Sequence, residues 1–185
     1  MRWILASVSL LLLFAGSNAI LKEMGITIKK IDYENSRQAQ DLVNLLNAYT
    51  EDPMGGGEAL SDDVKTNLCQ RLAKVPSAFT LIAYDESETP AGLVNCFEGF
   101  STFAGRPLVN IHDMYVADAF RGRGISQALL AAAEDEARAR GCCKMTLECL
   151  SKNEVALKAY KKSGYGNYEL DPTHGVAMMF EKKLK

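Results

Sequence analysis

One short run of the sequence has residue types that suit the binding of a phosphate group. It reads Arg121-Gly122-Arg123-Gly124-Ile125-Ser126 and lies where an apolar segment ends and a helical pattern begins. The first backbone N–H groups of a helix have no partner inside the helix and lie at the positive end of its dipole. Glycines let the backbone approach an anion closely, and arginines add charge and paired donors. The run is therefore a candidate anion site, although a plain helix start or a solvated basic loop has the same composition.

A second pattern lies downstream, on a predicted helix. Asn153, Ala156 and Tyr160 are separated by three and four residues, so they share one helix face. Asn153 can cap the helix, and the phenol of Tyr160 can donate a hydrogen bond. For Tyr160 taken alone, a half-buried packing role is the alternative.

Together the two patterns resemble the GNAT superfamily of N-acetyltransferases. Arg121 and Gly124 fill the first and fourth places of its motif Q/R-x-x-G-x-G/A, and Ser126 stands where glycine or alanine is usual. Residues 153–165 resemble the later family pattern N-x-x-A-x-x-x-Y-x-x-x-G-F/Y. The resemblance covers about residues 26–184, and several short runs resemble a bacterial subgroup of these enzymes.

This resemblance implies a reaction and a set of residues. The reaction would be direct transfer of the acetyl group of acetyl-CoA to a primary amine of a small molecule. The position of Tyr160 in the family pattern favours it as the catalytic acid that gives a proton to the departing thiolate. Backbone groups near Met114, Tyr115 and Val116 would pair with the pantetheine arm, and an N–H near Tyr115 or Val116 would stabilise the oxyanion. The implied donor-binding residues are Met114, Tyr115, Val116, Arg121, Gly122, Arg123, Gly124, Ile125, Ser126, Asn153, Ala156 and Tyr160.

Several groups are candidates for the base that accepts the proton of the amine. His112 is one, because an imidazole titrates near neutral pH, but a structural histidine is an equal alternative. Glu148, on the adjacent predicted strand, is another, and a relay of water molecules is a third. Strand alternation predicts that Asp113 points to the opposite face from His112, so that at most one of them lines the cleft.

An acidic, glycine-rich loop follows the first predicted helix. Glu51, Asp52, Met54 and Gly55 lie in it, and further acidic residues follow up to position 63. Their field would attract a cationic acceptor, and the glycines indicate a loop that can act as a lid. A solvated acidic loop is the plainer interpretation. We take these four residues as the candidate acceptor-binding group.

Hydrophobic periodicity predicts the elements that hold these residues. Strands are expected at 26–31, 78–84, 92–103, 108–116, 144–150, 165–170 and 176–184, and helices at 35–49, 61–74, 124–140 and 153–162. We expect a single α/β (α+β) domain over residues 24–185. The resemblance implies a GNAT-like mixed, mostly antiparallel sheet of about seven strands flanked by about four helices.

Composition narrows the classes of partner. The formal net charge is -2, which gives no basic field for nucleic acid. Five cysteines without a C-x-x-C pair, and two distant histidines, argue against a metal site and favour reduced thiols. The expected partner is a small-molecule amine, with a possible homodimer as in many relatives. The rival hypotheses are a non-catalytic module that binds acetyl-CoA and an exported interaction domain.

The first residues resemble a secretory signal. Arg2 precedes the apolar stretch 3–16, and the small residues Ser17-Asn18-Ala19 predict cleavage after Ala19. A dispensable extension is the alternative for residues 1–23, because Met24 opens a natural first strand. The segment would hold the protein at a membrane only if it were retained. Acetyl-CoA is a cytosolic metabolite and the thiols are expected to be reduced, so a cytoplasmic location is favoured over export.

Overall fold

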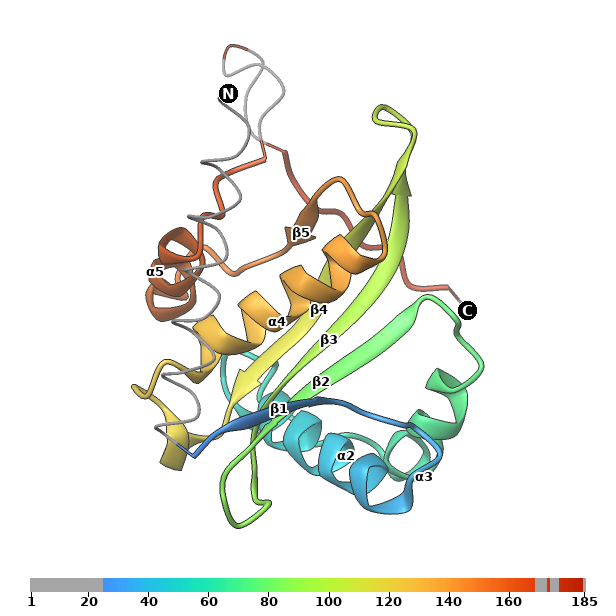
Figure 1. The fold of residues 1–185 in the computed structure, drawn as a ribbon, viewed down its shortest axis with the longest axis vertical. Helices are drawn as coiled ribbons and strands as arrows, with labels where there is room; N and C mark the ends of the chain where they lie inside the picture. Colours follow the sequence, from blue (N-terminus) through green and yellow to red (C-terminus); the bar gives the residue numbers. More distant parts are fainter. Residues whose placement is uncertain (1–24, 169–172, 174–176, 185) are drawn as a thin grey trace, which may run out of the picture.

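A mixed sheet of five strands lies at the centre of the chain (Figure 1). The computed structural model describes residues 25–168, 173 and 177–184, so the signal-like segment 1–23 lies outside the described part. The strands are β1 (Thr27–Lys30), β2 (Ala78–Tyr84), β3 (Pro90–Ser101), β4 (Arg106–Val116) and β5 (Met145–Leu147). They lie in the order β1-β2-β3-β4-β5; only β4 and β5 are parallel. The predicted mixed, mostly antiparallel α/β arrangement is confirmed.

Helices cover both faces of this sheet. α2 (Ser36–Glu51) and α3 (Asp62–Leu72) contribute to the core on one face, and α4 (Ile125–Ala139) packs on the other (Figure 1). The short 3-10 helix η1 (Asp118–Phe120) precedes α4, and α5 (Glu154–Lys162) follows β5. Successive side chains of β2 point to opposite faces of the sheet, so they belong to two separate parts of the hydrophobic core. Leu81 packs in the cluster under α4, and Ile82 packs in the cluster under α2. None of the described helices is long and apolar enough to cross a membrane.

Side-chain caps start three of the helices. The side chains of Asn35, Ser61 and Asn153 each accept a hydrogen bond from the backbone N–H three residues on, at 3.1, 3.4 and 3.1 Å. Each contact satisfies one N–H that has no partner within the helix. The caps therefore set the starts of α2, α3 and α5 close to the predicted helix starts at 35, 61 and 153, and with them the positions of Tyr49 and Tyr160.

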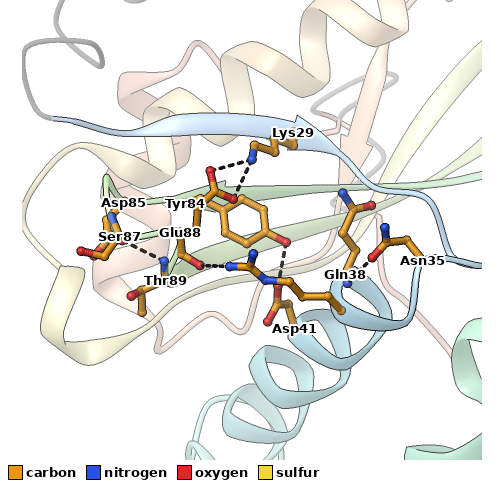
Figure 2. Close-up of polar contacts among 10 residues, drawn as sticks. Lys29, Asn35, Gln38, Asp41, Tyr84, Asp85, Ser87, Glu88 and Thr89 are labelled. Atoms are coloured by element: carbon orange, nitrogen blue, oxygen red, sulfur yellow. Dashed lines mark hydrogen bonds and ion pairs between the residues drawn. The ribbon is translucent and has the colours of Figure 1, made fainter.

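Polar contacts tie the turn between β2 and β3 to β1 and α2 (Figure 2). The carboxylate of Glu88 accepts a hydrogen bond from Lys29 Nζ at 2.7 Å, and its backbone carbonyl accepts one from Arg37 at 3.0 Å. The phenol of Tyr84 donates to Asp41 on α2 at 3.0 Å. Burial, followed by this contact with Asp41, raises the pKa of Tyr84. The cluster fastens α2 to the sheet and contains none of the predicted site residues.

The last strands differ from the sequence prediction. Only Met145–Leu147 of the expected strand 144–150 is paired, and the described residues 165–168 and 177–184 form no strand. The remaining residues of the last two expected strands, 169–170 and 176, lie outside the described residues. Met178 and Phe180 are 70% and 82% exposed. A segment with strand propensity forms a strand only beside the edge of another strand, and β5 offers an edge of only three paired residues. The expected number of about seven strands is therefore wrong, since the described residues form five.

Candidate active site

A cavity of about 790 Å³ lies between the end of β4, the start of α4, α5 and the C-terminal end of α2. Its walls are formed by Tyr49, Asp52, Met54, Met114, Tyr115, Val116, Phe120, Arg121, Gly122, Gly124, Ile125, Ser126, Gln127, Lys152, Asn153, Glu154, Val155, Ala156, Lys158, Ala159, Tyr160 and Lys162. All the predicted donor-binding residues except Arg123 are among them. The fold therefore brings the two sequence patterns, 121–126 and 153–160, to one site.

The backbone at the start of α4 has the geometry of an anion cradle. Gly122 and Gly124 both have φ of 76°, a left-handed conformation that costs an L side chain energy. Gly124 is the N-cap of α4, and no side chain caps the helix. The N–H groups of the first turn, including those of Ile125 and Ser126, thus have no partner inside the helix. Together with the helix dipole, they can hold a pyrophosphate.

Arg121 does not reach into this cradle as a free cation. Its guanidinium contacts the carboxylates of Asp52 at 3.0 Å and Asp118 at 2.9 Å. Its Nε donates to the carbonyl of Val116 at 3.0 Å, and the group lies 5.6 Å from the centre of the Tyr115 ring. Arg121 therefore links the end of β4 to the loop after α2. It contributes to the cavity wall mainly as part of this link.

The edge of β4 beside the cavity has no strand partner in the described part of the chain. Pairing with β5 covers Val109–Ile111 and ends at the contact of Ile111 with Leu147. Met114, Tyr115 and Val116 still pair with β3 on their other edge. Their second edge leaves backbone N–H and C=O groups for a bound molecule. This is the arrangement that the expected pairing with a pantetheine arm requires.

Tyr160 lies on α5 where this edge meets the cavity. Its ring packs against that of Tyr165 in a T-shaped contact, with the ring centres 6.0 Å apart. Burial, and then the neighbouring Cys149 and Tyr49, raise the pKa of Tyr160 to about 12. A phenol with so high a pKa stays protonated at neutral pH, which is the state that a proton donor needs. The packing and donor roles are compatible at this position.

A β-bulge in β4 changes the arrangement of the candidate bases. Asn95 lies opposite Asp113, whereas the next residue of β3 lies opposite Ile111, so His112 is the extra residue. His112 makes an edge-on ring contact with Phe97 at 5.5 Å, on the same face as Asn95. The expectation that His112 and Asp113 point to opposite faces is therefore wrong, because the bulge breaks the alternation. Both lie on the face toward α2.

The surroundings of Asp113, His112 and Glu148 differ. Asp113 accepts a hydrogen bond from Asn95 at 3.0 Å, and Asn95, which is 5% exposed, accepts one from Thr80 at 2.6 Å. His112 and Glu148 are exposed, and Glu148 contacts Asn110 at 3.3 Å. None of the three is part of the cavity wall. Asp113 alone is held by a buried polar chain.

On the acceptor side, Asp52 and Met54 line the cavity, whereas Glu51 and Gly55 do not. Glu51 accepts a hydrogen bond from Asn47 at 3.0 Å. A Cβ at Gly55 would lie 1.9 Å from the carbonyl oxygen of Tyr49, so this glycine allows a close approach of two backbone segments. The backbone N–H of Met54 and then Arg121 hold the pKa of Asp52 below its usual value, so that it stays ionised.

Several cavity residues were not anticipated from the sequence. Tyr49, at the end of α2, contacts Tyr115 with ring centres 5.9 Å apart. Burial, followed by the charges of Asp113 and Asp52, raises the pKa of Tyr49. Lys152, Lys158 and Lys162 also line the cavity. The spacing of Lys158 and Lys162 on the predicted helix was a signal that could have identified them.

No group of three or more His, Cys, Asp or Glu residues that could hold a metal ion occurs among the described residues. All five cysteines are free thiols, and burial raises the pKa of Cys96 to about 12 and that of Cys69 as well. The polar groups that line the cavity include backbone amides, phenols, carboxylates and amines.

Sequence comparison finds acetyltransferases. The family model described as the Acetyltransferase (GNAT) family matches residues 40–165. An acetyltransferase of Agrobacterium fabrum is 33% identical over 84 residues, which cover 45% of this chain and 55% of the relative. The streptothricin acetyltransferase of Streptomyces lavendulae is 36% identical over 75 residues, or 40% of either chain. The matched segments thus span about half or less of these curated relatives.

Solved structures with the same fold include an aminoglycoside acetyltransferase. An aminoglycoside acetyltransferase from an uncultured soil metagenomic sample, in complex with sisomicin, has a TM-score of 0.71 and 17% identity, covering 89% of this chain and 99% of that one. AAC(6')-Iy, in complex with the bisubstrate analogue CoA-S-monomethyl-acetylneamine, has a TM-score of 0.67 and 16% identity, covering 86% and 99%. At these identities the likeness shows the fold.

Proposed function

Because this chain belongs to the GNAT family of acetyltransferases, we propose that it transfers the acetyl group of acetyl-CoA to a primary amine of a small, cationic molecule. One observation carries the proposal: a single cavity joins the uncapped start of α4 to the phenol of Tyr160. The first can bind a pyrophosphate and the second can donate a proton. Both are needed when coenzyme A is the leaving group.

Backbone groups make most of the contacts with the donor. Amides from Gly122 to Ser126 hold the pyrophosphate of the donor, and the unpaired edge of Met114–Val116 holds the pantetheine arm. An N–H near Tyr115 or Val116 stabilises the oxyanion that develops as the amine attacks the thioester carbon. Tyr160 then gives its proton to the departing sulfur. Its pKa of about 12 keeps the phenol protonated at neutral pH, as a proton donor must be.

Asp113 is the group that we assign to the attacking amine. It holds the ammonium group of the acceptor and takes its proton, directly or through water. Its hydrogen bond with the buried Asn95 supports the assignment, as does its effect on the pKa of Tyr49, which lines the cavity. His112 and Glu148 are more exposed and are the less favoured alternatives.

Negative charge on the acceptor side supports a cationic acceptor. Asp52 lines the cavity and stays ionised, and Asp113 lies one residue before the cavity wall at Met114. Carboxylates at this position raise the local concentration of cations. Streptothricin acetyltransferase and the aminoglycoside acetyltransferases, similar to this chain in sequence or fold, are named for amine-bearing antibiotics. The free cysteines and the cytosolic donor support a cytoplasmic reaction.

Calorimetric titration of acetyl-CoA into the full chain tests the donor site with two matched variants. Gly124 and Gly141 lie at opposite ends of α4, have φ of 76° and 72°, and have no atom within 4 Å of an added Cβ. Gly124→Glu and Gly141→Glu thus introduce similar strain and the same charge, but only Gly124 lines the cavity. We expect Gly124→Glu to weaken binding by about a hundredfold or more and Gly141→Glu to leave it unchanged.

Turnover is then measured with a panel of cationic amines, including sisomicin, neamine and streptothricin, against neutral primary amines. Release of coenzyme A is followed by chromatography, because the five cysteines would react with thiol reagents. A folded parent that binds no acetyl-CoA would overturn the proposal. Binding without turnover on any amine would favour a module that only binds acetyl-CoA.

A further inference from the structure

The cavity continues beyond the cradle along α5 and its preceding residue. This part of the wall includes Val155, Ala159 and the side chains of Lys152, Lys158 and Lys162. The proposed transfer uses the cradle and Tyr160 and leaves these lysines without a role. The remaining parts of a molecule whose pyrophosphate lies at the start of α4 would occupy the rest of the same cavity, whose walls include these lysines.

The arginines of the cradle do not supply free positive charge. Arg121 already contacts two carboxylates, from Asp52 and Asp118, at 3.0 and 2.9 Å. The guanidinium of Arg123 lies 5.4 Å from the centre of the Phe120 ring, and Arg123 is not part of the cavity wall. The positive charges that remain available to a ligand in this cavity therefore come from the lysines.

The three lysines are only weakly engaged within the protein. Lys158 contacts Glu154 at 3.8 Å, and the two side chains are 81% and 80% exposed, so solvent screens the pair. Lys152 and Lys162 form no ion pair with any other described residue. Lys158 and Lys162 are four residues apart on α5, so they share a helix face. Flexible ammonium groups at the mouth of a cavity suit a solvated phosphate.

We infer that Lys152, Lys158 and Lys162 form a site for the 3'-phosphate of coenzyme A. This inference rests on the proposed function, which puts acetyl-CoA in the cavity. The 3'-phosphate carries about two negative charges at neutral pH, separate from those of the pyrophosphate. The lysines thus select an acyl donor that has the complete nucleotide. A donor held only through phosphopantetheine, as on an acidic carrier protein, lacks this group.

The test measures binding of acetyl-CoA and of 3'-dephospho-acetyl-CoA to the full chain by calorimetry. We expect the parent to bind acetyl-CoA about tenfold more tightly than the dephospho form at low ionic strength. The triple variant Lys152→Ala/Lys158→Ala/Lys162→Ala should lose this preference while its affinity for the dephospho form stays unchanged. Added salt should reduce the preference of the parent, because exposed charges are screened.

Two further variants serve as controls. Lys161→Ala removes an equal charge from the same helix at a position that does not line the cavity, so the preference should persist. Changing the three lysines to arginine keeps their charge and should also preserve it. Equal binding of both donors by the parent would overturn the lysine site and leave the proposed function intact. Faster acetyl transfer from an acetylated carrier protein than from acetyl-CoA would also overturn it, and binding of neither donor would overturn both proposals.

Discussion

The donor and acceptor sides of the cavity are built in different ways. The proposed donor side depends on backbone groups, namely the uncapped first turn of α4 and the edge of Met114–Val116, which has no strand partner among the described residues. The acceptor side depends on side chains from separate elements, among them Tyr49 on α2 and Asp52 in the loop after it. Arg121 connects the two sides through its contact with Asp52. Of the two sides, only the donor side therefore requires a local sequence pattern.

Backbone sites leave a signature because their geometry restricts the residues. A left-handed φ at Gly122 and Gly124 requires glycine, and both are visible as a motif. Side-chain sites impose no such rule on neighbouring positions. Consequently, the acceptor side can change its residues while the donor side stays the same, which is how one fold serves many acceptors.

The largest effect is expected where the two sides meet, at Tyr160. Tyr160→Phe keeps the ring and removes the proton donor, so kcat should fall by about a hundredfold or more. Affinity for acetyl-CoA should change little, since the cradle is untouched. The measurement is steady-state kinetics with the best amine of the panel, beside calorimetric binding of acetyl-CoA.

Tyr165→Phe is the matched control for this variant. Tyr165 is a partly buried phenol in contact with Tyr160, and it donates to Met145 Sδ at 3.7 Å, but it does not line the cavity. It should retain the kcat of the parent. Because the pKa of Tyr160 is raised to about 12, loss of its proton should not reduce the kcat of the parent below pH 10. An equal loss of kcat in both variants would assign Tyr160 a packing role.

The next effect concerns the acceptor side, through Asp113. Asp113→Asn removes the charge while keeping the shape, and we expect kcat/KM for the amine to fall by roughly tenfold, the loss of one charge-assisted hydrogen bond. Binding of acetyl-CoA should be unchanged. The fall in kcat/KM should be smaller for neutral amines than for cationic ones, because the lost interaction is with positive charge. If the variant lowered the affinity for acetyl-CoA as much as that for the amine, the division of the cavity into two sides would be contradicted.

A smaller effect is expected at the contact between the sides. Asp52→Asn breaks the ion pair with Arg121. The affinities for acetyl-CoA and for the amine should each fall by only about two- to fivefold, since the pair is partly exposed. The pKa of Asp52 is lowered, so its contribution is present above the usual value near 4 and is lost as the pH falls below it. Affinities measured at pH 5 and 7 should therefore show the same ratio of variant to parent. Asp63→Asn, which breaks the exposed pair with Arg71 outside the cavity, is the control.

The sequence predicted the parts that local chemistry determines. Caps and hydrophobic periodicity identified the four α-helices of the described residues, because each start is marked by a residue such as Asn153 or a glycine such as Gly124. The bulge at His112 was not predicted, since it depends on the pairing of β4 with β3. Nor was the short β5, because the length of a strand is set by its neighbour. For the same reason the site was predicted best at the cradle and least well at the candidate base.

The smallest effect is expected at His112, and it tests whether the bulge separates this residue from the chemistry. The imidazole is exposed and makes an edge-on contact with Phe97, and it does not line the cavity. His112→Gln should therefore change kcat/KM by less than about twofold, as is usual for surface positions. The decisive readout is the comparison with Asp113→Asn. If His112 were the base, His112→Gln would lower kcat/KM at least as much as Asp113→Asn does, whereas the assignment to Asp113 requires the loss to occur in Asp113→Asn alone.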